Sequence, residues 1–414
     1  MLVKFIKTEL QHFRKLTDAA QKVLEVYAVY EFVYPLLTIF VNAFILRQTN
    51  DFLAVAMYNF GSFFSMPLGF YLNGLLLKHH KIHVPFLIGM VGQGIVAFLV
   101  FFLSFQSFPA LFLFGLLQGF PMGIFWGNRN FINLEVTHDE SRTYFTGLEM
   151  ILSTIAATTM PLLVGWTIQF GDSTHIYSAS LAYKCLGLLG IVVLFLGGKR
   201  LASAGLDQPK FQKLWLGWTH PTWNLSRVIE VLRGIQNAID LFMVPLVIFT
   251  FLGREGSLGT LQSAASLIGI VMIYALARFL KPSRRVHTVG LNVIALVTLS
   301  MIFAISFSQW SALLYVLFSG TIALISWMAS NPISMKLIDD QENGDKTNNY
   351  AYVCDRELFL NVGRVIGVVI FYVLVKLTTQ ELGLRFIPLL LSLTQVIFYV
   401  LVSRLAKVKK SDFC

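Results

Sequence analysis

The sequence predicts an all-α polytopic membrane protein with twelve transmembrane helices in two pseudo-symmetric six-helix bundles. Composition is the first reason: of 414 residues, 56% are hydrophobic and 13% are charged, whereas soluble domains are about 45–50% apolar and about 25% charged. The second is that apolar stretches of about 20 residues, enough to cross the hydrocarbon of a bilayer, recur from end to end. The third is an internal repeat relating the two halves of the chain. Together these observations exclude a water-soluble fold.

Residues 1–22 precede the first apolar stretch and mix basic with apolar side chains at helical spacing. The basic residues include Lys4, Lys7, Arg14 and Lys15. This pattern predicts an amphipathic segment that lies on the cytosolic surface of the membrane. The apolar h-region and small-residue cleavage site of a signal peptide are missing before the first span, so we expect no cleavage.

Twelve apolar stretches follow, and each is predicted to cross the membrane as one helix. Short polar or basic segments separate consecutive stretches. The predicted spans are residues 23–46, 52–77, 84–104, 109–135, 144–168, 176–197, 226–252, 257–280, 287–307, 310–336, 350–375 and 384–404.

The longest break in hydrophobicity lies at residues 199–224, midway along the chain, and is rich in Lys and Arg. It predicts a cytosolic loop between two domains. The N-terminal six-helix bundle then covers residues 23–198 and the C-terminal bundle covers residues 225–405. Residues 406–414 form a basic C-terminal tail.

The distribution of Lys and Arg predicts the orientation of these spans. With both termini in the cytosol, most of the 32 basic residues fall on the cytosolic side, and four fall on the outer side: Arg47, Arg254, Lys376 and Arg385. We therefore expect an integral protein of the plasma or inner membrane with both termini cytosolic. The net charge of +10 then reflects topology and contact with anionic membrane lipids, and it requires no nucleic-acid partner.

The two halves repeat one another in sequence. Five residues of the fourth span recur in the tenth at an offset of 201 residues: Gly119, Trp126, Asn130, Ile132 and Asp139 correspond to Gly320, Trp327, Asn331, Ile333 and Asp340. Tyr144 and Glu149 in the fifth span correspond to Tyr350 and Asp355 in the eleventh. Parallel repeats of this kind are typical of transporters whose binding site lies between the two halves.

Short motifs in the first half resemble those of the major facilitator superfamily. Gln118-Gly119 followed by Gly123 is similar to its R-x-x-Q-G-x-G element, with Gly115 at the position of the arginine. The basic loop after the second span occupies the place of its G-x-x-x-D-R-x-G-R-K element, but Asn73 replaces the aspartate. The resemblance covers the layout of the whole chain, and it implies a central cavity lined by spans 1, 4, 7 and 10.

Polar side chains follow one face of several spans at spacings of three, four and seven residues. The seventh span has the clearest ribbon, with Glu230, Arg233, Asn237 and Asp240. Ionisable groups are costly in hydrocarbon, so they are expected to face the bundle interior or a water-filled cavity. The residues predicted to bind substrate, with core packing as the alternative for the aromatic ones, are Tyr27, Tyr34, Trp126, Arg129, Asn130, Arg233, Asn237, Trp327 and Asn331.

Three carboxyl groups are candidates for proton coupling, namely Glu31, Glu149 and Asp240. Burial in a low dielectric favours the protonated form of a carboxyl group, and a nearby arginine favours the ionised form. Such a group can bind and release a proton as its surroundings change. Arg129 and Arg233 stay charged, and their planar guanidinium suits a carboxylate or phosphate. We therefore expect a substrate with an anionic group.

The cytosolic end of the eleventh span has a dense polar cluster. The residues predicted to form a gate or a salt bridge are Asp355, Arg356, Glu357, Asn361 and Arg364. Their depth suits a latch between the halves. The alternative is an internal salt bridge that holds helices together, such as Glu357 with Arg364 or Arg233 with Asp240.

These features predict a secondary active transporter that moves a small organic solute by alternating access, coupled to protons or another ion. Export of amphipathic or drug-like compounds is the alternative, and a receptor or lipid scramblase is the alternative from another class. Neither an enzyme nor a nucleotide-driven pump is expected, because no catalytic constellation or phosphate-binding loop stands out. We expect no cofactor and no metal, and a monomeric protein.

Overall fold

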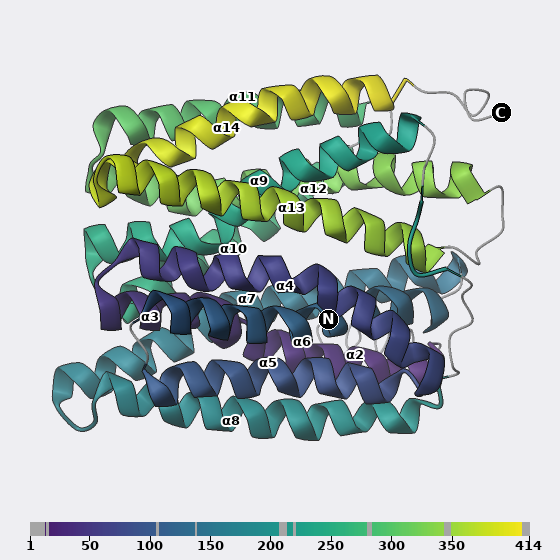
Figure 1. Ribbon diagram of the computed structural model, residues 1–414, viewed down its shortest axis with the longest axis horizontal. Coiled ribbons are helices and arrows are strands. Elements are labelled where there is room, and N and C mark those ends of the chain that lie inside the picture. The colour runs from purple at the N-terminus through teal and green to yellow at the C-terminus, as the bar shows by residue number, and fades with distance from the viewer. Residues whose placement is uncertain are drawn as a thin grey trace, which may run out of the picture.

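The computed structural model describes residue 13 and residues 16–104, 107–136, 139–206, 213–217, 221–279, 284–342 and 349–407. Within these ranges the chain forms helices and no strands (Figure 1). The helices are α2 (Asp18–Pro35), η1 (Leu36–Phe40), α3 (Val41–Thr49), α4 (Phe52–His79), α5 (His83–Leu103), α6 (Phe108–Val136), α7 (Asp139–Thr174), α8 (Ala179–Arg200), η2 (Leu201–Ala204), α9 (Pro221–Leu252), α10 (Glu255–Phe279), α11 (Arg285–Ser306), α12 (Gln309–Glu342), α13 (Asn349–Leu377) and α14 (Gln380–Leu405).

Eleven helical segments in the described ranges are long and apolar enough to cross a membrane. The remaining long helix, α10, has 25 residues and packs beside α7 and α12. The prediction of an all-α, twelve-helix membrane protein is therefore confirmed. Several helices run past the predicted spans: α7 has 36 residues and α12 has 34, so both project beyond a hydrocarbon core about 30 Å thick.

The first span is interrupted near its middle. Pro35 lies inside the helix and has no backbone N–H to donate. The chain widens at this point into the π-helical turn η1 and then continues as α3. Such local departures from the α-helix are frequent at functional sites.

Parts of three predicted segments lie outside the described residues. These are residues 1–12, 14 and 15 of the N-terminal segment, residues 207–212 and 218–220 of the central loop, and residues 408–414 of the tail.

The helices run side by side along the long axis of the molecule, with the first half below and the second half above in Figure 1. Within the first half, α4 packs against α6 and α5 against α8. Within the second half, α9 packs against α13 and α11 against α14. The halves meet along two seams, α7 with α10 and α4 with α13. This arrangement is the pair of six-helix bundles expected from the repeat.

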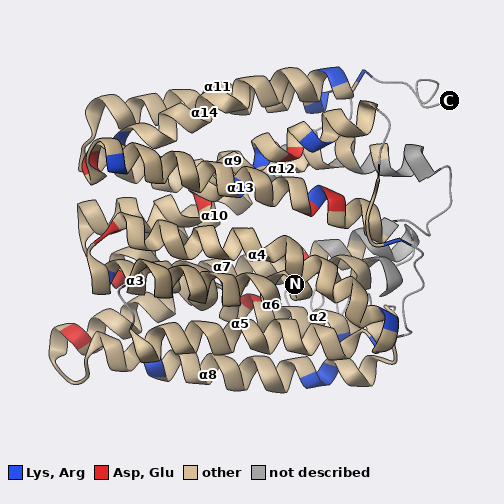
Figure 2. Ribbon diagram, in the orientation of Figure 1, with Lys and Arg blue, Asp and Glu red and all other residues tan. Residues whose placement is uncertain are grey.

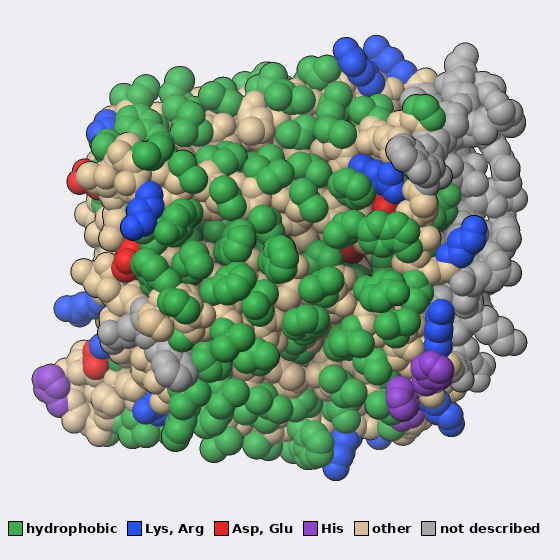
Figure 3. Space-filling model, in the orientation of Figure 1, with side chains coloured by type: hydrophobic (Ala, Val, Ile, Leu, Met, Phe, Trp, Pro, Cys, Tyr) green, Lys and Arg blue, Asp and Glu red, His purple; other side chains and the backbone are tan. Residues whose placement is uncertain are grey.

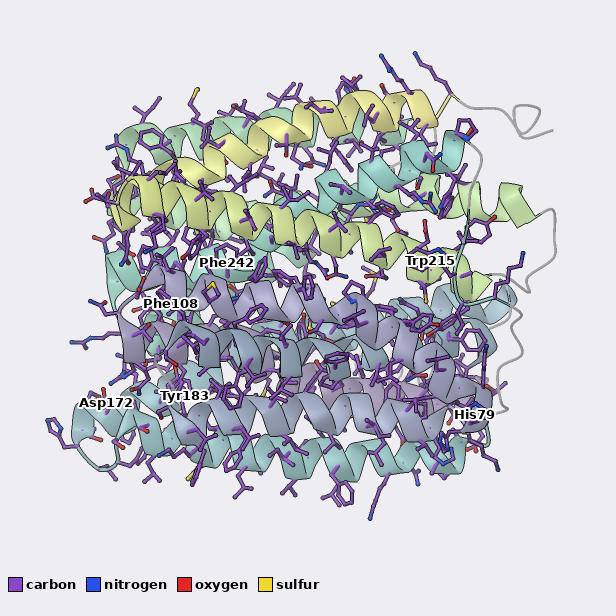
Figure 4. The ribbon with its side chains drawn as sticks, in the orientation of Figure 1. His79, Phe108, Asp172, Tyr183, Trp215 and Phe242 are labelled. Atoms are coloured by element: carbon purple, nitrogen blue, oxygen red, sulfur yellow. The ribbon has the colours of Figure 1, made fainter. Side chains whose placement is uncertain are left out.

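The two ends of the helix bundle carry charge, and the surface between them is apolar. We call the end that holds His79 the basic end and the end that holds Asp172 the opposite end (Figure 4). Basic residues gather toward the helix ends in Figure 2. Hydrophobic side chains cover the face between them in Figure 3. Over the described chain as a whole, the exposed large hydrophobic residues include Leu163, Leu196 and Ile305. Such a broad apolar surface suits contact with lipid.

Glycines allow neighbouring helices to touch at the backbone. A Cβ added to Gly115 of α6 would lie 2.1 Å from the carbonyl oxygen of Tyr58 in α4. In the second half, Gly234 of α9 faces Gly363 of α13, and a Cβ on Gly363 would lie 2.0 Å from the carbonyl oxygen of Val231. Small residues at helix interfaces are the usual route to close packing in membranes. The contact at Gly363 fixes the position of the adjacent Arg364.

We expect the substitution Gly363→Ala to lower the free energy of unfolding, because the added methyl group overlaps the backbone of α9. Overpacking of this kind costs about 1–3 kcal/mol. The measurement is thermal unfolding of the purified protein in detergent. Gly320→Ala in α12 is the matched control, since no atom of the described residues lies within 4 Å of the Cβ it would add. Equal melting temperatures for the two variants would contradict the prediction.

Candidate functional site

The interior of the first half contains one arginine held by two carboxylates. Arg129 of α6 lies 2.7 Å from Glu31 of α2 and 2.7 Å from Glu149 of α7. Its Nε also donates to Glu149 Oε1 at 3.0 Å. Arg129 and Glu31 are buried and Glu149 is partly buried, with side-chain exposed fractions of 7%, 10% and 13%. The cluster therefore holds one carboxylate more than it has guanidinium groups.

Aromatic and amide side chains surround this cluster. The guanidinium of Arg129 lies over the rings of Tyr27 and Trp126, at 4.8 and 4.9 Å from the two centroids. Tyr27 donates its hydroxyl to Asn133 Oδ1 at 2.9 Å, and Asn133 donates to Glu149 at 3.3 Å. Trp126, Arg129 and Asn133 share one face of α6 because they are three and four residues apart. Cation–π contact and hydrogen bonds thus fix the orientation of the arginine.

The second half encloses a polar cavity of about 170 Å³ between α9, α11, α12, α13 and α14. The ribbon predicted on the seventh span forms one wall of it. The polar residues that line it are Glu230, Arg233, Gln236, Asn237, Asp240, Asn292, Ser326, Ser330, Arg356, Arg364 and Gln395, and Trp327 contributes an aromatic face.

Arg233 is paired within its own helix. Its Nη1 donates to both carboxylate oxygens of Glu230, at 2.7 and 2.8 Å, and its Nη2 donates to Ser330 Oγ at 3.1 Å. Arg356 lies 3.9 Å from Glu230 and donates to Asn331 Oδ1 at 3.3 Å. The partner of Arg233 is therefore Glu230, and not Asp240 as one sequence alternative suggested.

Asp240 lies on the same face as this ion pair but has an amide partner. Gln236 Nε2 donates to its Oδ1 at 3.1 Å. Among the described residues, no Lys or Arg lies within 4.0 Å of its carboxylate. Asp240 is thus an acidic group on the cavity wall whose charge no ion pair neutralises in the described part of the chain.

Arg364 reaches from the second half toward the first. Its Nε donates to Asn237 Oδ1 at 2.7 Å, and its Nη1 donates to Asn361 Oδ1 at 3.0 Å and to Met66 Sδ at 3.4 Å. Its guanidinium lies 5.5 Å from the ring centroid of Phe63 in α4. In the described ranges its hydrogen-bond partners are amides and a thioether, and the suggested ion pair with Glu357 does not form.

Asp355 is bound inside the second half. Arg227 of α9 approaches both of its oxygens at 2.8 Å, and Trp223 donates its ring N–H at 2.7 Å. All three residues belong to α9 and α13, so this ion pair joins two helices of one bundle. The predicted gate cluster placed Asp355 in a latch between the two halves, but this ion pair does not link them.

The other predicted residues fall around these groups. Tyr34 lies between Tyr30 and Trp126, with ring centroids 5.5 and 6.3 Å away. Trp327 is 48% exposed and faces the second-half cavity. Asn130 is partly buried on α6.

Several residues of the cavity were not predicted from the sequence. Asn292 of α11 and Gln395 of α14 stand among apolar neighbours, and Gln236 of α9 lies beside the predicted ribbon. A polar side chain isolated in an apolar span is itself a signal of an interior position.

The opposite end has an ion-pair network that spans the halves. Arg47 of α3 lies 2.6 Å from Asp172 of α7 and 2.7 Å from Glu255 at the start of α10. Gly256 donates its backbone N–H to Gln169 of α7 at 2.9 Å. A vestibule of about 1050 Å³ lies over this network. The α7–α10 seam is therefore tied together by charge and by backbone contact.

The α4–α13 seam also has contacts near the basic end. Tyr350 of α13 donates its hydroxyl to the carbonyl oxygen of Phe70 at 3.0 Å and accepts from Asn73 at 3.0 Å. At the opposite end, Gln380 Oε1 at the start of α14 accepts from the backbone N–H of Phe52 at the start of α4, at 3.2 Å. The two halves are thus in contact at both ends of the molecule.

Curated proteins with related sequences carry no assigned activity in their names. "Uncharacterized protein YqgE" of Bacillus subtilis (strain 168) is 26% identical over 368 residues, which cover 86% of this chain and 81% of that protein. "Uncharacterized protein in sodM 3'region" of Geobacillus stearothermophilus is 27% identical over 164 residues, covering 40% and 70% of the two chains.

Solved structures share the fold at low sequence identity. The nucleoside transporter NupG superposes with a TM-score of 0.67 at 13% identity, covering 95% of this chain and 100% of that chain. The Major Facilitator Superfamily transporter FucP, in the outward conformation, gives 0.61 at 10% identity, covering 95% and 99%.

The sequence model of the Major Facilitator Superfamily matches residues 26–347, which is most of the chain. This match agrees with the two six-helix bundles, the repeat and the superposed transporters. The chain therefore belongs to the Major Facilitator Superfamily.

Proposed function

We propose that the protein is a secondary active transporter that moves a small polar organic solute by alternating access and couples the movement to protons. The observation that carries this proposal is the polar cavity in the second half, lined by five ionisable side chains. Ionisable groups at membrane depth are costly and mark substrate or ion pathways. The superposed proteins support it, since NupG is a nucleoside transporter and FucP is the E. coli fucose:proton symporter.

We assign alternating access to movement of the two halves against each other. In the state seen here, the α7–α10 seam is closed at the opposite end by Arg47, Asp172 and Glu255. Close backbone approach supports this closure, because a Cβ on Gly259 would lie 2.1 Å from the carbonyl oxygen of Pro161. Opening toward the vestibule then requires separation of Arg47 from Glu255.

We propose Asp240 as the main proton-binding group. A carboxylate without a cationic partner gains more from binding a proton in a low dielectric than one held by an arginine. Glu31 and Glu149 share Arg129, so one proton on either would balance their cluster. They are second candidates for coupling.

We propose that any anionic group of the solute binds at Arg364. The sequence predicted this role for Arg129 and Arg233, but each of them already forms an ion pair with at least one carboxylate. Arg364 holds amide partners, which an incoming carboxylate or phosphate can replace with stronger, charge-assisted hydrogen bonds. The ionisable and amide side chains on the cavity wall support such a solute over the drug-like compounds of the efflux alternative.

We further propose that the basic end faces the cytosol in a plasma or inner membrane and that the transporter is a monomer. Lys199, Arg200 and Arg404 at the last turns of α8 and α14 follow the positive-inside pattern. Arg356, Glu357 and Asn361 near this end remain candidates for the gate that closes on the cytosolic side.

Asp240→Asn is expected to reduce solute uptake driven by a pH gradient at least about tenfold, equivalent to 1.4 kcal/mol. Solute exchange without a gradient should persist, because the amide keeps the shape of the side chain and removes the titrating group. Uptake of labelled sugars, nucleosides and organic acids into proteoliposomes measures both. Asp18→Asn, which changes an exposed pair with Lys22, is the control. Gradient-driven uptake equal to that of the control variant would remove Asp240 from the coupling role.

Glu255→Gln is expected to shift the equilibrium toward the state open at the vestibule, because it removes the charge that binds Arg47. Leu241 of α9 lies between the halves, beside Asn42 of α3. A cysteine in its place, in a chain with Cys185 and Cys414 changed to Ser, should react faster with an impermeant thiol reagent added from that side. An increase of at least about fivefold is expected. Glu25→Gln, which breaks the Arg200 pair within one half, is the control. Unchanged labelling in Glu255→Gln would show that the network does not hold the seam.

Arg364→Gln is expected to raise the half-saturating concentration of D-gluconate at least about tenfold, because a charge-assisted hydrogen bond is lost. Binding of D-glucose should change little. The measurement is the shift in melting temperature with each compound. Arg385→Gln, at a residue that donates to the carbonyl oxygens of Ala304 and Ile305, is the control. An equal rise in the half-saturating concentrations of D-gluconate and D-glucose would mean that Arg364 supports the structure of the cavity and does not bind an anionic group.

A further inference from the structure

The cavity of the second half has a recess formed by helices on the outer side of the bundle. Asn292 of α11 and Gln395 of α14 reach it from helices whose other faces carry exposed apolar residues such as Leu291 and Val396. Across from them stands Gln236 of α9, which is 8% exposed. These three amides converge on one space, although two of them come from helices that otherwise serve as lipid-facing support.

Two of the three amide groups keep a buried polar atom without a hydrogen-bond partner among the described residues. These atoms are Gln236 Oε1, an acceptor, and Asn292 Nδ2, a donor. The orientation of Gln236 is set by chemistry, because only its Nε2 can donate to the carboxylate of Asp240. Arg233 Nε is a second donor without a hydrogen-bond partner in the described part of the chain. A buried polar atom without a partner is unfavourable, so this wall is built for a guest that both accepts and donates.

Hydroxyl groups match this pattern better than other common groups. One hydroxyl donates one hydrogen bond and accepts two, so neighbouring hydroxyls can accept from Asn292 and Arg233 and donate to Gln236. A carboxylate could accept from the donors but would face the oxygens of Gln236 and Asp240. The cavity of about 170 Å³ offers roughly ten times the space that one water molecule needs. The half-exposed ring of Trp327 supplies an apolar wall for the carbon skeleton.

We propose that this recess binds the hydroxyl-bearing part of the transported solute, and that the solute is a small polyhydroxylated compound of the sugar or nucleoside class. The assignment rests on the proposed transport function, because it names the substrate class of the same cavity. It adds Asn292 as a residue that selects the solute and leaves the proton-binding group unchanged.

The test is binding to the purified full-length protein, measured as the shift in melting temperature with D-glucose, L-fucose, xylitol and uridine. Cyclohexanecarboxylate and benzoate serve as probes without hydroxyl groups. At least one hydroxylated probe should stabilise the wild type, and Asn292→Ala should raise its dissociation constant at least about tenfold. Ser300→Ala is the matched control, since Ser300 lies on the same helix and does not line the cavity, and its buried hydroxyl has no hydrogen-bond partner within the described ranges.

Asn292→Ser covers the case in which Asn292→Ala does not fold, because the smaller residue keeps a donor. Its dissociation constant for the hydroxylated probe should lie between those of the wild type and of a variant that no longer binds. Two results would overturn the proposal: no hydroxylated probe stabilises the wild type, or Asn292→Ala and Ser300→Ala weaken binding equally. The second result would mean that Asn292 supports the packing of α11 and does not contact the solute.

Transport separates this inference from the function on which it rests. Uptake of the probes without hydroxyl groups, with none for the four hydroxylated ones, would overturn the substrate class and leave a transporter. Binding of a hydroxylated probe that depends on Asn292, with no flux of that probe in proteoliposomes, would support the recess and overturn the transport function.

Discussion

The interior of the first half depends on how Arg129 is neutralised. A guanidinium at membrane depth cannot lose its proton, so it must be paired. Glu31 and Glu149 arrive from two other helices, and the rings of Tyr27 and Trp126 cover the remaining face. Removing one partner of a buried ion pair costs about 3–5 kcal/mol because the other charge stays behind. The pairing therefore fixes how α2, α6 and α7 sit relative to one another.

The second half also pairs its buried charged groups, but with different partners. Glu230 pairs with Arg233 on one helix, and Asp355 pairs with Arg227 across α9 and α13. These ion pairs involve only part of the polar ribbon on α9. The amide side chains and Asp240 therefore remain on the cavity wall. The close contact of Gly234 with Gly363 brings α9 and α13 together at this depth. Backbone packing thus holds α9 and α13 together at the depth where polar side chains line the cavity.

Spacing along the chain predicted which residues face the interior, and it predicted partners less well. The ribbon of α9 follows from positions three and four apart, and its residues do line one cavity. The choice of Glu230 over Asp240 as partner of Arg233 also follows from geometry, since a rise of about 1.5 Å per residue puts Asp240 roughly 10 Å along the helix. The ion pair between Asp355 and Arg227 depends on how α9 and α13 cross. The residue pattern within one span does not predict that crossing. Asn292 was not predicted because the family resemblance places the cavity along spans 1, 4, 7 and 10, whereas Asn292 lies in span 9.

The repeat explains both the likeness and the difference between the halves. Trp126 and Trp327 occupy corresponding positions, but Arg129 corresponds to Ser330. In the first half that position carries the charge that gathers two carboxylates. In the second half the hydroxyl of Ser330 accepts a hydrogen bond from Arg233, which belongs to another helix. The arginine therefore lies on α6 in the first half and on α9 in the second, and Ser330, at the position that corresponds to Arg129, lines the cavity. The shared scaffold thus places a buried arginine in one half where the other half has a cavity wall.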